Sequence, residues 1–195
     1  MNFRIILYVL GGLLRLLGLF MIIPLGVAYY YGESLTPFLV SILVTTLTGF
    51  LLLSYKTEEE WMRKEGFAIV ALGWLAAAVF GAIPFIMDGI SPLNAFFESM
   101  SGFTTTGSTI LNDIESHPKS ILFWRGMIMW LGGMGIIVLF IAILPKLGVA
   151  GRQLFRAEMP GPTEDKLKPR VRETARILWT IYFVISFLQV IVLML

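Results

Sequence analysis

Long runs of apolar residues alternate with short charged or turn-rich segments along this chain. The five longest cover residues 5–31, 35–55, 67–87, 121–144 and 177–195. Because roughly 20 apolar residues are needed to cross a bilayer as a helix, each run predicts a membrane-spanning helix. Pro24 predicts a kink in the first span, and Arg15 places a charge inside it. Since only the turn Gly32-Glu33-Ser34 separates the first two runs, residues 1–56 are predicted to form an antiparallel helical hairpin.

A further apolar-rich run, residues 93–103, is too short to cross a bilayer. Pro92 suits the first turn of a helix and Ser91 suits its N-cap, which predicts a helix over residues 92–103. This helix would enter the membrane and the chain would leave by the same face. Residues 67–145 are therefore predicted to form one unit of helix, re-entrant pore loop and helix.

Composition supports an all-α integral membrane protein. Apolar residues make up 57% of the chain and charged residues 14%, and the mean hydropathy is +0.82. A soluble domain of this composition would expose large apolar patches, which soluble proteins rarely do. The absence of cysteine excludes a disulfide framework and a thiolate metal site.

Basic residues predict the orientation in the membrane. Lys56, Arg63 and Lys64 follow the second span, and eight further lysines and arginines lie in the joint 146–176. Loops rich in lysine and arginine stay on the cytoplasmic side, so both joints and the N-terminus are predicted to be cytoplasmic. The basic joint is read mainly as an anchor for helices at anionic lipid, and a docking role is the alternative.

The re-entrant loop is then predicted to face outward, and its charges are acidic. Asp88, Glu98, Asp113 and Glu115 lie in this region, which contains no basic residue between Lys64 and Lys119. A mouth of one sign concentrates ions of the opposite sign. The region therefore favours cations, although Asp113 and Glu115 taken singly are also ordinary solvated loop acids.

The segment after the short helix, residues 104–108, is the candidate filter. Consecutive peptide carbonyls on a non-helical backbone replace the hydration shell of a cation. Thr104, Thr105 and Thr106 are β-branched and suit such a course, and Gly107 tolerates a positive φ. Main-chain oxygens of these four residues are the predicted ligands of a monovalent cation.

Two charges at membrane depth are predicted to support this filter. Glu98 lies on the short helix and Arg125 lies in the fourth span, so we expect them to form an ion pair behind the filter; an arginine that reaches the headgroups is the alternative. Gly132, Gly133 and Gly135 interrupt the fourth span. Close helix packing is the favoured explanation for them, and a hinge is the other.

Three motifs resemble the Trk-type potassium uptake subunit, in the superfamily that includes the Ktr and HKT transporters. They are residues 97–108, which match that family's first pore loop, and residues 130–136 and 155–162, which match its next helix and the following cytoplasmic joint. The resemblance implies four helix, pore loop, helix units around a central pore, preceded by a hairpin. This chain would be the N-terminal portion, with one of four filter segments, and residues 177–195 would begin the second unit.

The same resemblance implies the transported ion and the partners. Gly107 stands where the family has its key filter glycine, which indicates potassium. Family members form dimers in the prokaryotic cytoplasmic membrane and bind a cytoplasmic nucleotide-binding regulatory subunit. No nucleic-acid partner is predicted.

Other classes of function are less consistent with the sequence. The single histidine, His117, lies in the polar return and is read as a surface residue, so no histidine-based triad or two-histidine metal site can form within the chain. An enzyme is not predicted. A small self-assembling tetrameric channel and a non-conducting membrane scaffold remain the alternatives.

Overall fold

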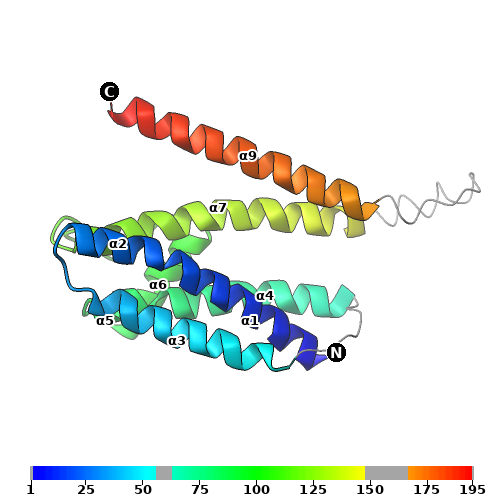
Figure 1. Ribbon diagram of the computed structural model, residues 1–195, viewed down its shortest axis with the longest axis horizontal. Helices are drawn as coiled ribbons and strands as arrows, with labels where there is room; N and C mark the ends of the chain where they lie inside the picture. The colour runs from blue at the N-terminus through cyan, green and yellow to red at the C-terminus, as the bar shows by residue number, and fades with distance from the viewer. Residues whose placement is uncertain (1, 56–62, 148–166, 195) are drawn as a thin grey trace, which may run out of the picture. The chain divides into compact units, whose positions relative to one another are not determined.

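The computed structural model describes residues 2–55, 63–147 and 167–194, and helices are the regular secondary structure of all three ranges. Figure 1 shows their course along the chain. The helices are α1 (Phe3–Phe20), α2 (Ile22–Tyr30), α3 (Thr36–Leu53), α4 (Arg63–Gly81), α5 (Ile83–Met87), α6 (Pro92–Phe103), α7 (Lys119–Leu147) and α9 (Leu167–Met194). The chain divides into two compact units, Met1–Gly132 and Gly133–Leu195, and the first contains the candidate site.

The described helices include four that are long and apolar enough to cross a membrane. These spans are Phe3–Tyr30, Thr36–Leu53, Lys64–Met87 and Arg176–Met194. The remaining predicted run, 121–144, lies within the single helix α7. An all-α membrane fold is thus confirmed. In the predicted basic joint, residues 148–166 lie outside the described residues, and α9 begins at Leu167 within that joint.

Two prolines divide predicted spans into a long and a short helix. The break predicted at Pro24 lies three residues earlier, at Met21, between α1 and α2. Proline has no N–H to donate to the carbonyl four residues before it, so the helix breaks in the turn that precedes the proline. Pro84 has the same effect in the third span, where α4 ends at Gly81 and α5 begins at Ile83. The break before Pro84 was not predicted from the sequence.

The N-terminal hairpin accommodates the charge predicted inside the first span. The guanidinium carbon of Arg15, on α1, lies 4.5 Å from the centre of the Phe50 ring on α3. A cation over an aromatic face is attracted by the negative charge of that face. The apolar hairpin therefore holds this charge by a local contact.

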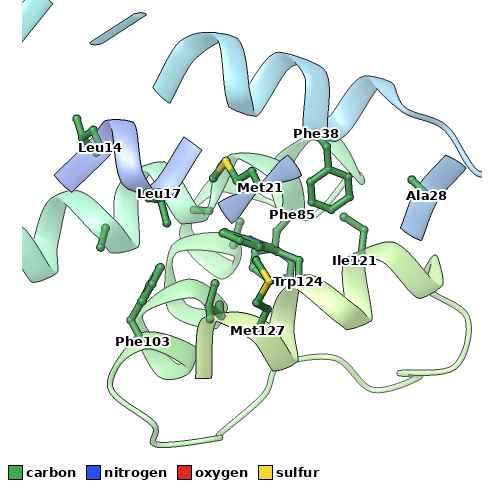
Figure 2. Close-up of a cluster of buried hydrophobic side chains, with 14 residues drawn as sticks. Leu14, Leu17, Met21, Ala28, Phe38, Phe85, Phe103, Ile121, Trp124 and Met127 are labelled. Atoms are coloured by element: carbon green, nitrogen blue, oxygen red, sulfur yellow. The ribbon is translucent and has the colours of Figure 1, made fainter. Parts of the chain in front are cut away.

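A hydrophobic core joins the hairpin to the helices around α6. Figure 2 shows Trp124 of α7 among Met21, Phe85 and Met127. Trp124 is fully buried, and its Nε1 donates to the Gly81 carbonyl at 2.9 Å. That carbonyl lies at the end of α4, where the proline break opens the helix. The bond fixes α7 against the end of α4, and α6 packs against both of these helices.

The turn between α2 and α3 also caps α7. The carboxylate of Glu33 accepts hydrogen bonds from the backbone N–H groups of Lys119 at 2.7 Å and of Ser120 at 3.0 Å. Partial burial acts to raise the pKa of the Glu33 carboxyl, but the hydrogen bonds from Ser120 and Lys119 outweigh it and lower this pKa. A negative charge at a helix N-terminus is favourable, so the turn holds the start of α7 in place.

Candidate functional site

The helix α6 (Pro92–Phe103) has the same bounds as the short helix predicted from the sequence. Pro92 is in its first turn, as expected. Ser91 occupies the N-cap position, but its hydroxyl makes no capping bond to the amides of that turn, all of which are described. The predicted capping role of this side chain is therefore wrong. The re-entrant course of α6 in a membrane stays a prediction.

The end of α6 is closed by a left-handed turn at Thr105. The Thr105 N–H donates to the Gly102 carbonyl at 2.9 Å and the Thr106 N–H to the Ser101 carbonyl at 3.0 Å. This is the pattern of a Schellman motif, in which the residue with positive φ is usually glycine. Thr105 has a φ of +58°, a strained conformation for a β-branched residue. Strain of about 1–3 kcal/mol of this kind is found mostly at functional sites.

The candidate filter residues after this turn are not helical and lie at the surface of the first unit. Thr104, Thr105 and Thr106 are exposed. Gly107 has a φ of +76°, which confirms the prediction that glycine serves here for its backbone freedom. The left-handed conformation of Thr105 was not predicted, because nothing in a run of three threonines distinguishes the residue that takes the turn.

The main-chain oxygens of the four predicted ligands fall into two groups. The Thr104 carbonyl accepts a hydrogen bond from its neighbour's hydroxyl, Thr105 Oγ1, at 2.7 Å, and the Gly107 carbonyl accepts one from Arg125 Nη2 at 3.2 Å. Those of Thr105 and Thr106 accept no hydrogen bond from the described residues. These two oxygens are the ones best able to bind a cation.

Glu98 and Arg125 are in contact behind this segment. Arg125 Nε lies 2.9 Å from Glu98 Oε2, and the Glu98 side chain is 0% exposed while that of Arg125 is 19% exposed. The other carboxylate oxygen of Glu98 accepts hydrogen bonds from Thr109 Oγ1 and from the Ile110 N–H, both at 2.6 Å. The pair expected from the sequence is thus present. Through Thr109 and Ile110 it also holds the segment that follows Gly107. Support of an ion filter by this pair stays a prediction.

Gly132 of α7 provides space for the end of α6. A Cβ at this position would collide with the Phe103 carbonyl oxygen and lie 2.7 Å from the Phe103 carbonyl carbon. Phe103 is the last residue of α6, directly before the threonines. The packing role predicted for this glycine is confirmed.

The acids of the loop are less uniform than predicted. Glu98 is buried and paired with Arg125, and Asp88 Oδ2 lies 2.7 Å from His117 Nδ1. The pairing of Glu98 with Arg125 was predicted from the sequence, whereas the contact between Asp88 and His117 was not. His117 was expected at the surface, yet its side chain is only 23% exposed. Asp113 and Glu115 remain exposed loop acids.

Comparison with known proteins places this arrangement in a recognised group. Residues 34–195 match the family model TrkH, described as a cation transport protein. The Trk system potassium uptake protein TrkH of Escherichia coli K12 is 46% identical over 193 residues, which cover 95% of this chain and 40% of that protein. The protein of the same name from Halomonas elongata is 43% identical over 189 residues, 93% of this chain and 39% of that protein.

A solved structure agrees with these relatives. The crystal structure of the potassium transporter TrkH from Vibrio parahaemolyticus matches this chain with a TM-score of 0.78 and 39% identity. The match covers 94% of this chain and 37% of that one. The chain thus spans about 40% of the length of the curated relatives it matches.

Proposed function

The chain belongs to the TrkH family of cation transport proteins, and from that premise we propose that it contributes the first of four filter segments to a potassium uptake protein. Such a protein is a transporter and not an enzyme. The names of the relatives, which specify potassium uptake, support the choice of ion. Residues 104–107 would bind potassium with main-chain oxygens after it sheds water.

The observation that carries this proposal is the state of two carbonyls at the exposed end of α6. In the described part of the chain, the main-chain oxygens of Thr105 and Thr106 accept no hydrogen bond, while the carbonyls of Thr104 and Gly107 each accept one. A helix C-terminus carries partial negative charge, which favours a cation beside it. Among residues 104–107, Thr105 and Thr106 would therefore be the main ligands, and the carbonyls of Thr104 and Gly107, which already accept hydrogen bonds, would contribute less.

Glu98 and Arg125 would act as support rather than as ligands. The Arg125 guanidinium contacts both the Glu98 carboxylate and the Gly107 carbonyl. Because Glu98 neutralises this guanidinium at close range, the arginine can orient a filter carbonyl with little repulsion of an approaching cation. This arrangement matches the needs of a filter better than those of a passive turn.

The setting proposed for this filter is the prokaryotic cytoplasmic membrane, with the N-terminus in the cytoplasm. Basic residues beside the second span support that orientation. A homodimer of the full-length protein, surrounding lipid and a cytoplasmic nucleotide-binding regulatory subunit are the proposed partners. Three further filter segments would come from the rest of the full-length protein.

Gly107→Ser tests the proposal. Serine at a φ of +76° is strained, so the carbonyls around it are expected to shift and discrimination between potassium and sodium to fall about tenfold or more. Rubidium uptake in competition with sodium, by cells that express the full-length protein, measures this ratio. Gly126→Ala is the control, because a Cβ there meets nothing within 4 Å. Discrimination equal to that of the unmodified protein would argue against a filter at residues 104–107.

A further inference from the structure

Ser101, in the last turn of α6, is attached to the candidate filter by both its backbone and its side chain. The residue is 6% exposed. Its carbonyl accepts hydrogen bonds from the Thr106 N–H at 3.0 Å and from the Gly107 N–H at 3.3 Å. Any residue at this position would supply that carbonyl, so these two bonds do not depend on serine.

The side chain makes a third bond that does depend on serine. Ser101 Oγ donates to the Ser108 carbonyl at 2.6 Å, across seven residues of sequence. Alanine would keep the two backbone bonds and lose this one. The hydroxyl therefore controls one specific peptide plane, that between Ser108 and Thr109.

With this bond, every residue from Gly107 to Ile110, directly after the free carbonyls of Thr105 and Thr106, is held by a hydrogen bond. The Gly107 carbonyl is held by Arg125, the Ser108 carbonyl by Ser101, and Thr109 Oγ1 and the Ile110 N–H by Glu98. On the other side, the Thr105 and Thr106 amides are bonded to the last turn of α6. The main-chain oxygens of Thr105 and Thr106 thus lie between two segments that are held by hydrogen bonds. Among the described residues of α6, Ser101 is the one whose side chain holds a filter carbonyl.

We infer that Ser101 is a positioning residue that sets the spacing of the ion-binding carbonyls, and thereby the preference for potassium over smaller cations; this inference rests on the proposed function. A filter that discriminates by the size of its cavity requires that the oxygens keep their distance when a smaller ion enters. A free Ser108 carbonyl would let the segment 105–108 relax around sodium. Loss of the hydroxyl is therefore expected to change selectivity more than the amount of protein.

Ser99 supplies a matched control on the same helix. It is 0% exposed, and its Oγ has no hydrogen-bond partner within the described part of the chain. Ser99→Ala and Ser101→Ala remove the same atom from the same buried helix. Only the second removes a bond to the filter.

The experiment compares Ser101→Ala, Ser99→Ala and the unmodified full-length protein by rubidium uptake in competition with sodium, normalised to protein in the membrane. For Ser101→Ala the discrimination is expected to fall about tenfold, the size of effect that one buried hydrogen bond can have. Ser99→Ala is expected to keep the ratio of the unmodified protein. A general packing defect would lower uptake of both ions and leave the ratio unchanged.

An unchanged ratio in Ser101→Ala, or an equal fall in Ser99→Ala, would overturn the positioning role. If Ser101→Ala does not reach the membrane, Ser101→Cys takes its place, since a thiol is a weaker donor; the same direction is expected, and an unchanged ratio again refutes the role. The proposed function fails separately, if Gly107→Ser leaves discrimination intact. Relaxed selectivity in Gly107→Ser with an unchanged ratio in Ser101→Ala would remove only the role of Ser101.

Discussion

Arg125→Gln is expected to abolish transport and to lower the free energy of unfolding by about 3–5 kcal/mol, because it leaves a carboxylate buried without its counter-charge. Glu98 has no exposed side-chain surface, and Arg125 is its charged partner at 2.9 Å. The substitution also removes the donor to the Gly107 carbonyl. Thermal unfolding of the purified full-length protein measures the first effect and rubidium uptake the second.

The double variant Glu98→Gln with Arg125→Gln separates charge from position. Glutamine at 98 can still accept the bonds from Thr109 and Ile110, and two neutral amides leave no buried charge, so much of the lost stability is expected to return. Transport is expected to stay low, since the Gly107 carbonyl still lacks its arginine. Lys119→Gln is the control on α7; it removes an exposed ammonium above the Tyr31 ring and is expected to cost less than about 1 kcal/mol. If Arg125→Gln alone proved as stable as Lys119→Gln, a structural ion pair between Glu98 and Arg125 would be ruled out.

Gly132→Ala is expected to be the most damaging single-methyl change in the described part of α7. The new Cβ would collide with the backbone of Phe103, and backbone cannot rotate away as a side chain can. Overpacking of this kind costs about 1–3 kcal/mol. Because Phe103 immediately precedes the threonines, displacement of its backbone is expected to shift the filter as well. Uptake is therefore expected to fall about tenfold or more, even if the variant still inserts into the membrane.

Gly126→Ala is the control for this change as well. It adds the same methyl to the same helix, with no atom within 4 Å, and is expected to leave uptake unchanged and to be neutral or slightly stabilising, because alanine favours a helix over glycine. Equal uptake by Gly132→Ala and Gly126→Ala would contradict the close approach of α7 to the end of α6.

Local pattern was sufficient for the helices but not for their ends. A run of about 20 apolar residues is a property of the sequence itself, so the spans and the helix 92–103 could be predicted. The break before Pro84 could have been predicted by the reasoning applied to Pro24. The bounds of α9 were harder, because its first turns are basic and carry no apolar signal.

Contacts between distant residues explain most of what the sequence did not show. Glu33 reaches the start of α7 across 86 residues, and Asp88 reaches His117 across 29; no pattern of spacing links them. Glu98 and Arg125 were paired correctly because charges at membrane depth are rare and need a partner. Ser101 was missed, since a serine in a helix has no feature that distinguishes it from Ser99 until the loop is seen to fold back on it.

The direct test of an ion filter at the end of α6 is the position of a bound ion. Anomalous diffraction from crystals of the full-length protein grown in rubidium is expected to show a peak in contact with the main-chain oxygens of Thr105 and Thr106. Rubidium peaks elsewhere along the pore, with none at these two oxygens, would contradict a filter built on them.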